Sequence, residues 1–319
     1  MRRIVSLLPA GTEIAAALGL MDQVMGVSHE CDFPDEANVR PRVTHCPVHN
    51  ADLTSREVDK WVRRALYENR TIYTIDQPLL RKLRPDIILT QKLCDVCAVG
   101  YGTVARLAET LPGPPQLINL EPSSLADIFD DIRCVAKVCD VPERAEKLIA
   151  NLSERVENVR EQAARIPHRP RCFLMEWVDP PFCSGQWGPE LVEIAGGYDS
   201  LGRRHLPSVQ IEWQEVLDTQ PDIIVLALCG YDIDRARRDY EILRRFPEFE
   251  SLPAARRGEM YLTDASAYFA RPGPRIVDSL EILAGVLHPR EFPEFASRGP
   301  DDPCVVRIAD KLDTTRATS

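Results

Sequence analysis

The sequence lacks the features that would assign it to a membrane-spanning, a nucleic-acid-binding or a common hydrolase class. None of its apolar runs approaches the about 20 residues that span a bilayer, so no membrane insertion is expected. Basic residues are scarce: 39 Lys and Arg face 49 Asp and Glu, and the net charge of −10 argues against a nucleic-acid partner. No G-x-S-x-G elbow, Walker loop or H-E-x-x-H motif is present.

An export signal is also not visible at the start of the sequence. Arg2 and Arg3 precede an apolar run, as in a signal peptide, but Pro9, Gly11 and Glu13 interrupt that run. The ten cysteines are scattered, unlike the dense spacing of small disulfide-stapled domains. Both observations favour a cytoplasmic protein over a periplasmic or lipid-anchored one. Cysteines in apolar segments are expected to be buried: Cys134, Cys139, Cys172 and Cys229.

The same phrase occurs twice, as LRPDIILTQKLC around Pro85 and as TQPDIIVLALCG around Pro221. Each copy has a Pro-Asp turn before a short apolar segment, Ile87 to Thr90 or Ile223 to Leu228. A continuous apolar run between turn residues is typical of a strand buried on both faces of a parallel sheet. The repeat favours two α/β lobes, although Pro-Asp before Ile-Ile is also common before strands in any α/β protein.

The chain divides into four predicted regions. Alternating strands and helices predict an N-terminal α/β lobe over residues 1–122 and a C-terminal one over 168–290. Residues 123–167 are predicted to be a helical linker, with a long helix over roughly 142–166 that would extend about 36 Å. Such a helix would reach both lobes, and a ligand would sit in the cleft between them. Residues 291–319 are predicted to form a surface tail that is partly disordered.

Six motifs in order carry a family resemblance: SLLPAGTEIAAALGL, SHECDFP, LRPDIIL, PPFCSGQWGPELVEIAGG, EVLDTQPDIIVL and RPGPRIVDSLEIL. From about Arg3 to Pro289 the chain resembles the substrate-binding proteins of vitamin B12 (cobalamin) and iron-siderophore ABC transporters, the vitamin B12 branch most. The resemblance implies two Rossmann-like lobes with mainly parallel sheets, joined by one long rigid α-helix. It also implies cobalamin, another corrinoid or a metal chelate in the cleft, and no catalysis.

The second lobe supplies six candidates for ligand contact: Trp177, Phe182, Trp187, Tyr268, Phe269 and Arg271. A corrin is a wide, flat ring with amide arms, so its site needs aromatic walls and a few hydrogen-bonding groups. The first three candidates follow a predicted strand, at the end where α/β sheets bind ligands. The other three lie in a second loop, and the resemblance implies that this loop supplies an aromatic residue and Arg271 to the ligand. The alternatives are core packing for the aromatic residues and a salt bridge for Arg271.

The loops of the first lobe, over residues 28–34 and 93–101, depart from the family pattern. Both are predicted to project from strand ends into the cleft. Their candidates are Cys31, Cys94 and Cys97 for a metal, and His29 and Tyr101 for the ligand. Three cysteines would suit Zn²⁺, an Fe–S cluster or another soft metal. A lone C-x-x-C also occurs as a redox-inert turn, and thiol contact with the ligand is a further alternative.

The sequence leaves the partner and one competing function open. In the family's importers an acidic residue on each lobe meets the membrane permease. The corresponding places, near Pro78 and Gln214, are not acidic here, although Asp76, Glu212 and Glu215 are close. An ABC permease partner is therefore not clearly indicated, and a cytosolic corrinoid-binding relative fits better. The alternative is a cytosolic metal- or Fe–S-binding redox protein or enzyme that uses the three cysteines.

Overall fold

The computed structural model describes residues 1–48, 52–68, 71–92, 101–295 and 304–308. The chain forms two compact units. Unit 1 comprises Met1–Glu154 together with Arg271–Arg275, and unit 2 comprises Arg155–Ala270 together with Ile276–Ser319. Each unit has its own mainly parallel sheet, which confirms the predicted α/β class. The boundaries predicted at residues 122 and 167 differ from this division, because it falls inside a helix and joins a late segment to unit 1.

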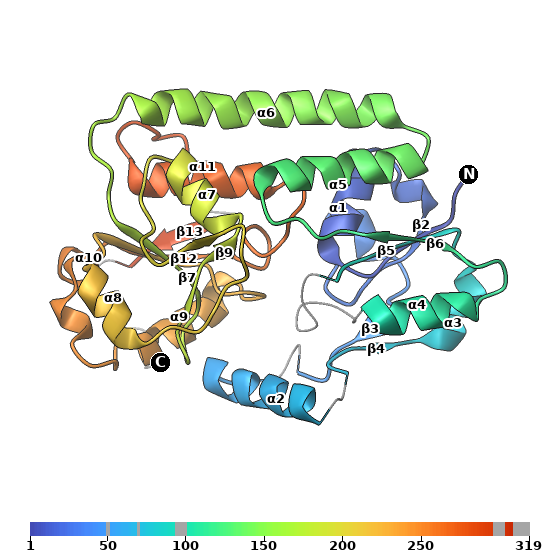
Figure 1. Ribbon diagram of the computed structural model, residues 1–319, viewed down its shortest axis with the longest axis horizontal. Helices are drawn as coiled ribbons and strands as arrows, with labels where there is room; N and C mark the ends of the chain where they lie inside the picture. The colour runs from blue at the N-terminus through green and yellow to red at the C-terminus, as the bar shows by residue number, and fades with distance from the viewer. Residues whose placement is uncertain (49–51, 69–70, 93–100, 296–303, 309–319) are drawn as a thin grey trace, which may run out of the picture. The chain divides into compact units, whose positions relative to one another are not determined.

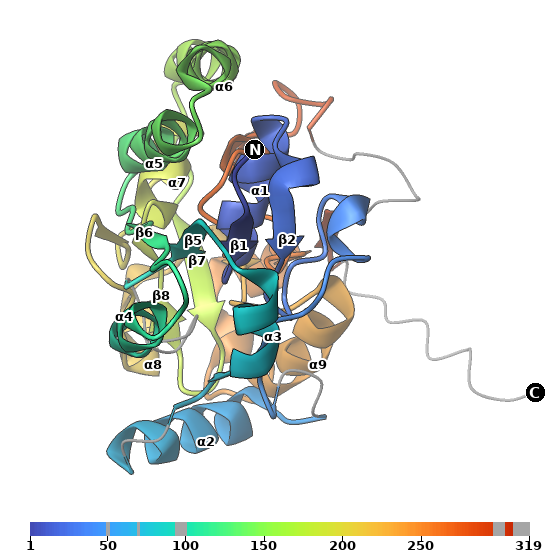
Figure 2. The same ribbon diagram turned by 90° about the vertical axis from the view of Figure 1, so that its right-hand side faces the viewer.

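The larger elements up to the unit boundary are β1 (Ile4–Ser6), α1 (Pro9–Ala17), β2 (Val24–Gly26), β3 (Thr44–His45), α2 (Ser55–Tyr67), β4 (Thr74–Ile75), α3 (Gln77–Leu83), β5 (Ile87–Thr90), α4 (Tyr101–Glu109), β6 (Gln116–Asn119), α5 (Leu125–Val138) and α6 (Pro142–Ala164). The main sheet has the order β2-β1-β5-β6, and all its neighbours are parallel. Helices α1 and α5 lie on one face of it, and α3 and α4 on the other (Figures 1 and 2). All four residues of β5 are buried, as its apolar sequence predicts.

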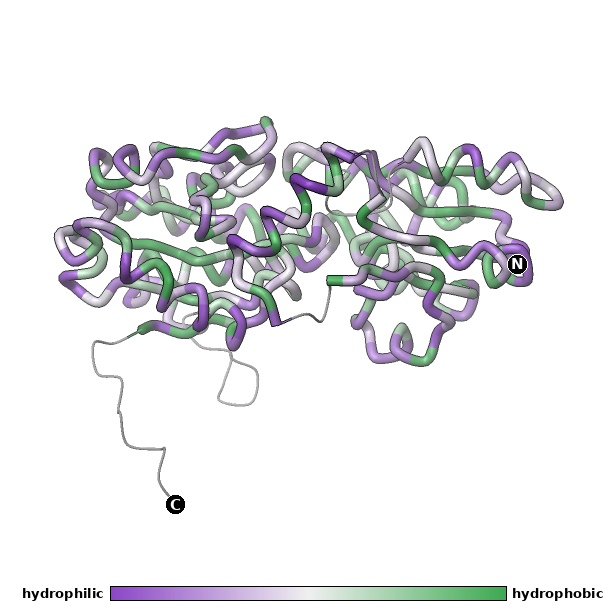
Figure 3. The backbone as a smooth tube through the Cα atoms, turned by 90° about the horizontal axis from the view of Figure 1, so that it is seen from below, coloured by the Kyte–Doolittle hydropathy of each residue, from purple (hydrophilic) through white to green (hydrophobic). Residues whose placement is uncertain are grey.

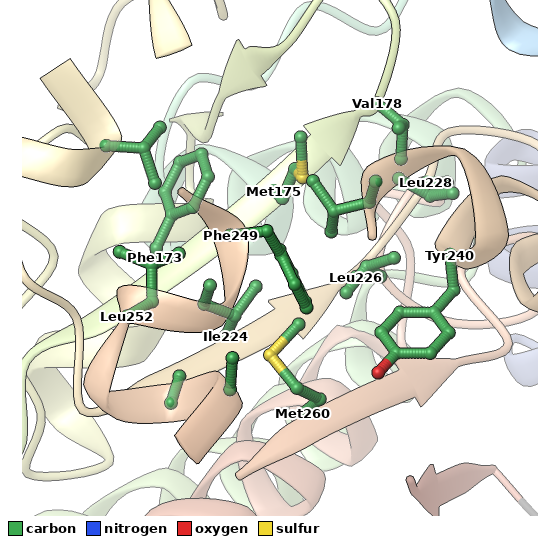
Figure 4. Close-up of a cluster of buried hydrophobic side chains, with 14 of the residues drawn as sticks. Phe173, Met175, Val178, Ile224, Leu226, Leu228, Tyr240, Phe249, Leu252 and Met260 are labelled. Carbon is green, nitrogen blue, oxygen red and sulfur yellow. The ribbon is translucent and has the colours of Figure 1, made fainter. Parts of the chain in front are cut away.

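The larger elements of unit 2 after α6 are β7 (Cys172–Trp177), β8 (Phe182–Cys183), β9 (Gly185–Gln186), α7 (Gly188–Ile194), β10 (Arg203–Arg204), α8 (Trp213–Thr219), β11 (Ile223–Leu226), α9 (Ile233–Leu243), α10 (Pro253–Arg257), β12 (Met260–Thr263), α11 (Ile276–Leu287) and β13 (Val305–Arg307). The sheet order is β13-β12-β11-β7-β8, with parallel pairs in the centre and antiparallel pairs at both edges. Helices α7 and α11 cover one face, and α8, α9 and α10 the other (Figure 1). The second face packs a core that includes Phe173, Ile224, Phe249 and Met260 (Figure 4).

The repeated phrase has the same local structure in both units. Each copy follows a short helix that ends in a left-handed residue, Arg84 (φ 45°) or Gln220 (φ 47°). The aspartate of each Pro-Asp pair then accepts a hydrogen bond from the residue that directly precedes the neighbouring strand. Asp86 accepts from the Arg3 backbone N–H at 2.8 Å. Asp222 accepts from the Arg171 backbone N–H at 3.1 Å. The Pro-Asp turn thus joins each strand to its parallel neighbour.

The predicted long helix is confirmed as α6, and the unit boundary falls between its residues Glu154 and Arg155. Its apolar face is buried, as the helical spacing predicts: Ile149, Leu152, Val156 and Val159 are 2–6% exposed. Within unit 2, Arg155 forms ion pairs at 2.6 Å with both Asp278 and Glu281 of α11. Ion pairs therefore join these two helices.

Residues 304–308 correct the prediction of a surface tail from residue 291 onward. They include β13, which pairs antiparallel with β12. Cys304 is 1% exposed and Ile308 is 9% exposed, so both side chains add to the core of unit 2. The short apolar segment CVVRI carries no helical or turn signal, and only the open edge of β12 gives it a place to pair.

Hydropathy follows the sheets of both units. In Figure 3 the hydrophobic colour runs along the strands, and the hydrophilic colour predominates in the outer helices and loops. Across the described residues, no helix is both long and apolar enough to cross a membrane.

Candidate functional site

The carboxyl edge of the unit 2 sheet gathers several chemically active side chains. Strands β7, β11 and β12 are parallel, so their carboxyl ends meet at one edge. In sheets of this kind, ligands bind at that edge. Trp177 is the last residue of β7, and Cys229 and Tyr231 follow β11. The predicted strand-end position of Trp177 is therefore confirmed.

Trp177 is the centre of an aromatic group at this edge. It pairs in register with Phe182 of β8, and both side chains are half-buried. On its other side, the Trp177 ring lies 5.0 Å from the Tyr231 ring, centroid to centroid, at an angle of 57°. Partly exposed aromatic rings supply apolar area at low entropic cost. This group can pack against one face or edge of a flat ligand.

Tyr231 and Arg235 belong to the same group, and the sequence analysis missed them. The Arg235 guanidinium lies 3.9 Å from the Tyr231 ring centroid, in cation–π contact. Tyr231 is only 3% exposed, and burial raises the pKa of its hydroxyl above the ordinary value. The signal that would have found them is position, because both follow β11 at its carboxyl end. Cys229, between β11 and Tyr231, is exposed rather than buried as predicted, since the chain has already left the sheet there.

The other aromatic candidates of unit 2 lie deeper. Trp187, Tyr268 and Phe269 are 6–9% exposed. The Trp187 indole Nε1–H donates to the Phe269 carbonyl at 3.1 Å, which ties the two predicted loops together. The burial of these three side chains agrees with the core-packing alternative, and their contact with a ligand stays a prediction.

Two half-buried acids fix the loop beside Trp177. Glu176 accepts a hydrogen bond from the Gly185 backbone N–H at 2.8 Å, and burial raises its pKa to about 7. Asp199 accepts from the Ser184 hydroxyl at 2.7 Å, and burial raises its pKa to about 6. Both acids bind loop atoms rather than pointing into solvent. They therefore position the residues that follow β8.

The carboxyl edge of the unit 1 sheet carries His29, one of the predicted ligand contacts. Its backbone N–H donates to the Thr44 hydroxyl at 3.0 Å, and its Nδ1 lies 2.7 Å from the same oxygen. The His29 ring is 5.5 Å from the Tyr73 ring. The side chain is half-buried, so Thr44 and Tyr73 fix its orientation. Tyr101, the first residue of α4, is also half-buried.

Arg271 lies in a buried charge network of unit 1. It is 5% exposed, and its guanidinium lies 3.2 Å from Glu13 and 3.0 Å from the Asp32 Oδ2. Arg275 also binds Glu13, at 2.6 Å, and lies 4.0 Å from the Phe33 ring centroid. The salt-bridge alternative for Arg271 is thus present, buried rather than at the surface, and its ligand contact stays a prediction.

The same network sets the charge of the loop that contains His29. Burial raises the pKa of Glu30 to about 7, against the opposing charge of Arg271. Burial alone would also raise the pKa of Asp32, but hydrogen bonds and the charge of Arg271 hold it below its ordinary value. Near neutral pH this loop therefore has one fixed carboxylate at Asp32 and one acid that is partly protonated at Glu30.

The cysteine metal site receives no support from the described residues. Cys94 and Cys97 lie outside them. Cys31 is fully buried, with its sulfur 3.1 Å from the Thr12 hydroxyl and 3.4 Å from the Ser28 hydroxyl. Burial raises the pKa of its thiol, which disfavours the thiolate that metals bind. Within the part of the chain that the structure describes, no three His, Cys, Asp or Glu side chains are placed to hold a metal ion.

Comparisons with known proteins give consistent results. The family model described as periplasmic binding protein matches residues 4–267. A vitamin B12-binding protein of Vibrio cholerae is 24% identical over 283 residues, which cover 88% of this chain and 86% of that protein. A vitamin B12-binding protein of Photorhabdus laumondii is 24% identical over 290 residues, covering 90% of this chain and 88% of that protein.

Solved structures support the same fold. The periplasmic heme-binding protein from Roseiflexus sp. RS-1 has a TM-score of 0.68 at 21% identity, covering 91% of this chain and 99% of that one. The periplasmic vitamin B12-binding protein of Vibrio cholerae has a TM-score of 0.65 at 23% identity, covering 90% and 96%. At these identities the structural likeness concerns the fold alone. The family match spans well over half of the sequence, and it shows that this chain belongs to the periplasmic binding protein family.

Proposed function

We propose that this chain is a non-catalytic binding protein for cobalamin, another corrinoid or a related flat metal chelate. The observation that carries the proposal is the aromatic group at the carboxyl edge of the unit 2 sheet, where Trp177 lies between Phe182 and Tyr231. A wide ring needs aromatic surface with few hydrogen-bonding groups, and this edge offers both. Vitamin B12-binding and heme-binding relatives of the same fold support this ligand class.

The proposal favours a corrinoid over heme. The curated relatives described above, which cover most of this chain, are named for vitamin B12. His29 and Tyr101 of unit 1 stay in the proposal as further ligand contacts. The redox-protein alternative is not proposed, because the Cys31 thiol is buried and hydrogen-bonded to two hydroxyl groups.

The comparisons do not support the predicted cytoplasmic location. The matched family and the structural relatives are named periplasmic. We therefore propose that the protein acts in the periplasm as the substrate-binding protein of an ABC importer. The acids near the expected docking positions act as helix caps: Asp76 accepts from the Leu79 backbone N–H, and Glu212 forms a reciprocal capping box with Glu215. The proposal of a permease partner therefore rests on the family resemblance.

A titration of the purified protein with cyanocobalamin, in parallel with heme, tests the proposal. Calorimetry gives the affinity and stoichiometry, and the visible spectrum reports the environment of the metal. Saturable binding of the corrinoid, tighter than that of heme, is the expected result. Saturable binding of heme alone would move the assignment to the heme-binding relatives. No saturable binding of either ligand would overturn the proposal.

A further inference from the structure

Arg235 lies at the proposed binding edge, and its guanidinium contacts an aromatic ring. It is in the first turn of α9, and residues 227–232 connect β11 to this helix. Its guanidinium lies over the Tyr231 ring at 3.9 Å, and that ring meets Trp177. The side chain is half-buried. A positive charge is therefore built into the aromatic group from which the ligand site is proposed.

The charges around Arg235 leave its guanidinium without an ion pair inside unit 2. Two acids precede Arg235 closely in sequence: Asp234 is its exposed neighbour, and Asp232 caps α9 by accepting the Arg235 backbone N–H at 2.8 Å. Asp239, one turn further along, is 3% exposed and acts electrostatically on Tyr231. Among the residues that the structure describes, no carboxylate lies within 4.0 Å of the Arg235 guanidinium nitrogens. Arginines elsewhere in the unit, such as Arg171 and Arg204, do have such partners.

Covering the Tyr231 ring does not by itself explain an arginine here. An apolar side chain of similar length would cover the ring without the desolvation cost of a half-buried cation. Guanidinium is the group best suited to bind phosphate or carboxylate oxygens, because its planar N–H donors match two oxygens at once. Contact with Tyr231 also restricts the side chain, so less conformational freedom is lost when an anion binds.

We infer that Arg235 binds a negatively charged oxygen group carried by the ligand, a phosphodiester or a carboxylate. The inference rests on the proposed function and narrows its ligand class to flat metal chelates that bear such a group. Cobalamin carries a phosphodiester in its nucleotide arm, and heme carries propionate carboxylates. Arg235 would then determine specificity, while Trp177 and Phe182 contact the ring.

A comparison of ligand pairs tests the inference. Each pair has one member with the anionic group and one without it: cyanocobalamin with dicyanocobinamide, and heme with heme dimethyl ester in the same mild detergent. Affinities are measured for the wild type, Arg235→Gln and Arg235→Lys. The matched control is Arg237→Gln, which removes the same charge from an exposed position on the same helix.

The expected result is selective. Arg235→Gln should weaken binding of the anionic member about 10- to 100-fold, as expected for a charge-assisted hydrogen bond, and leave the other member unchanged. Arg235→Lys should recover part of the loss, and Arg237→Gln should change neither affinity. The pair that responds identifies phosphodiester or carboxylate as the group bound.

Two outcomes would overturn the inference while the proposed function stands. Either Arg235→Gln weakens both members of each pair equally, or it changes neither, and in both cases Arg235 only covers Tyr231. If the wild type binds no member of either pair, the proposed function itself fails and the inference fails with it.

Discussion

Trp177 and Tyr231 meet at the carboxyl edge of the unit 2 sheet with their ring centroids 5.0 Å apart. Trp177 is the last residue of β7 and Tyr231 follows β11, its parallel neighbour, so their contact depends on the register that pairs these two strands. Arg235 lies on the outer side of the same group. The unit 1 edge is built differently, with a half-buried histidine above a buried charge network. The proposal therefore places the ring-binding surface on unit 2.

The Glu13 carboxylate is expected to be essential for the stability of unit 1. It is 2% exposed and binds both Arg271 and Arg275. The substitution Glu13→Gln removes the carboxylate that both arginines bind. Removing one partner of a buried ion pair should lower the free energy of unfolding by about 3 kcal/mol, measured by urea denaturation.

The matched control is Asp130→Asn, which removes a carboxylate from the exposed ion pair with Arg133. Its effect should be about 0.5 kcal/mol or less, as for most surface pairs. Equal effects of the two substitutions would show that the Glu13 network does not stabilise the fold.

The Glu176 carboxyl group should make unit 2 less stable as the pH rises. Its pKa is about 7 in the folded protein, above the ordinary value of 4.5, because the side chain is buried. Between these two pH values the folded state binds more protons than the unfolded state, so the free energy of unfolding falls with increasing pH. Glu176→Gln imitates the protonated acid and should stabilise the protein at pH 8, by on the order of 1–3 kcal/mol, but not at pH 4.

Urea denaturation at pH 4 and pH 8 checks this difference. Glu250→Gln, at an exposed position of unit 2, is the control and should change little at either pH. A gain for Glu176→Gln of the same size at both pH values would mean that the effect does not come from ionisation.

The strand β13 should protect the edge of the unit 2 sheet. A chain that ends at residue 295 loses the pairing with β12 and the burial of Cys304 and Ile308. Its free energy of unfolding should fall by about 2 kcal/mol or more, and the exposed strand edge should promote self-association. A chain that ends at residue 308 keeps β13 and should behave like the full chain. Urea denaturation and gel filtration of both chains test this prediction. Equal stability and equal self-association of the two chains would contradict it.

The sequence predicted the elements whose signals are local. The apolar run Ile87–Thr90 forms a buried parallel strand, and the helical spacing from Leu148 to Val159 forms a long helix with a buried face. The strand-end position of Trp177 was also predictable, because it depends on one strand and the general geometry of parallel sheets.

The rest depends on contacts between distant segments. Arg271 is 258 positions from Glu13, and no local pattern indicates that the segment Arg271–Arg275 packs with unit 1. The strand Val305–Arg307 forms because β12 offers an open edge, a property of the assembled sheet. Arg235, in the first turn of α9, contacts Tyr231, which precedes that helix, but the importance of this contact appears only when Trp177 is placed beside Tyr231.

The most direct test of the account is the affinity of Trp177→Ala for cyanocobalamin, measured by calorimetry. The substitution should weaken binding by about 1–3 kcal/mol, or about 5- to 150-fold, as for the loss of an aromatic anchor. Phe173→Leu, in the core at the other end of β7, is the control: it should lower stability by about 1–2 kcal/mol without changing the affinity. An unchanged affinity in folded Trp177→Ala would contradict the assignment of the ring-binding surface to this edge.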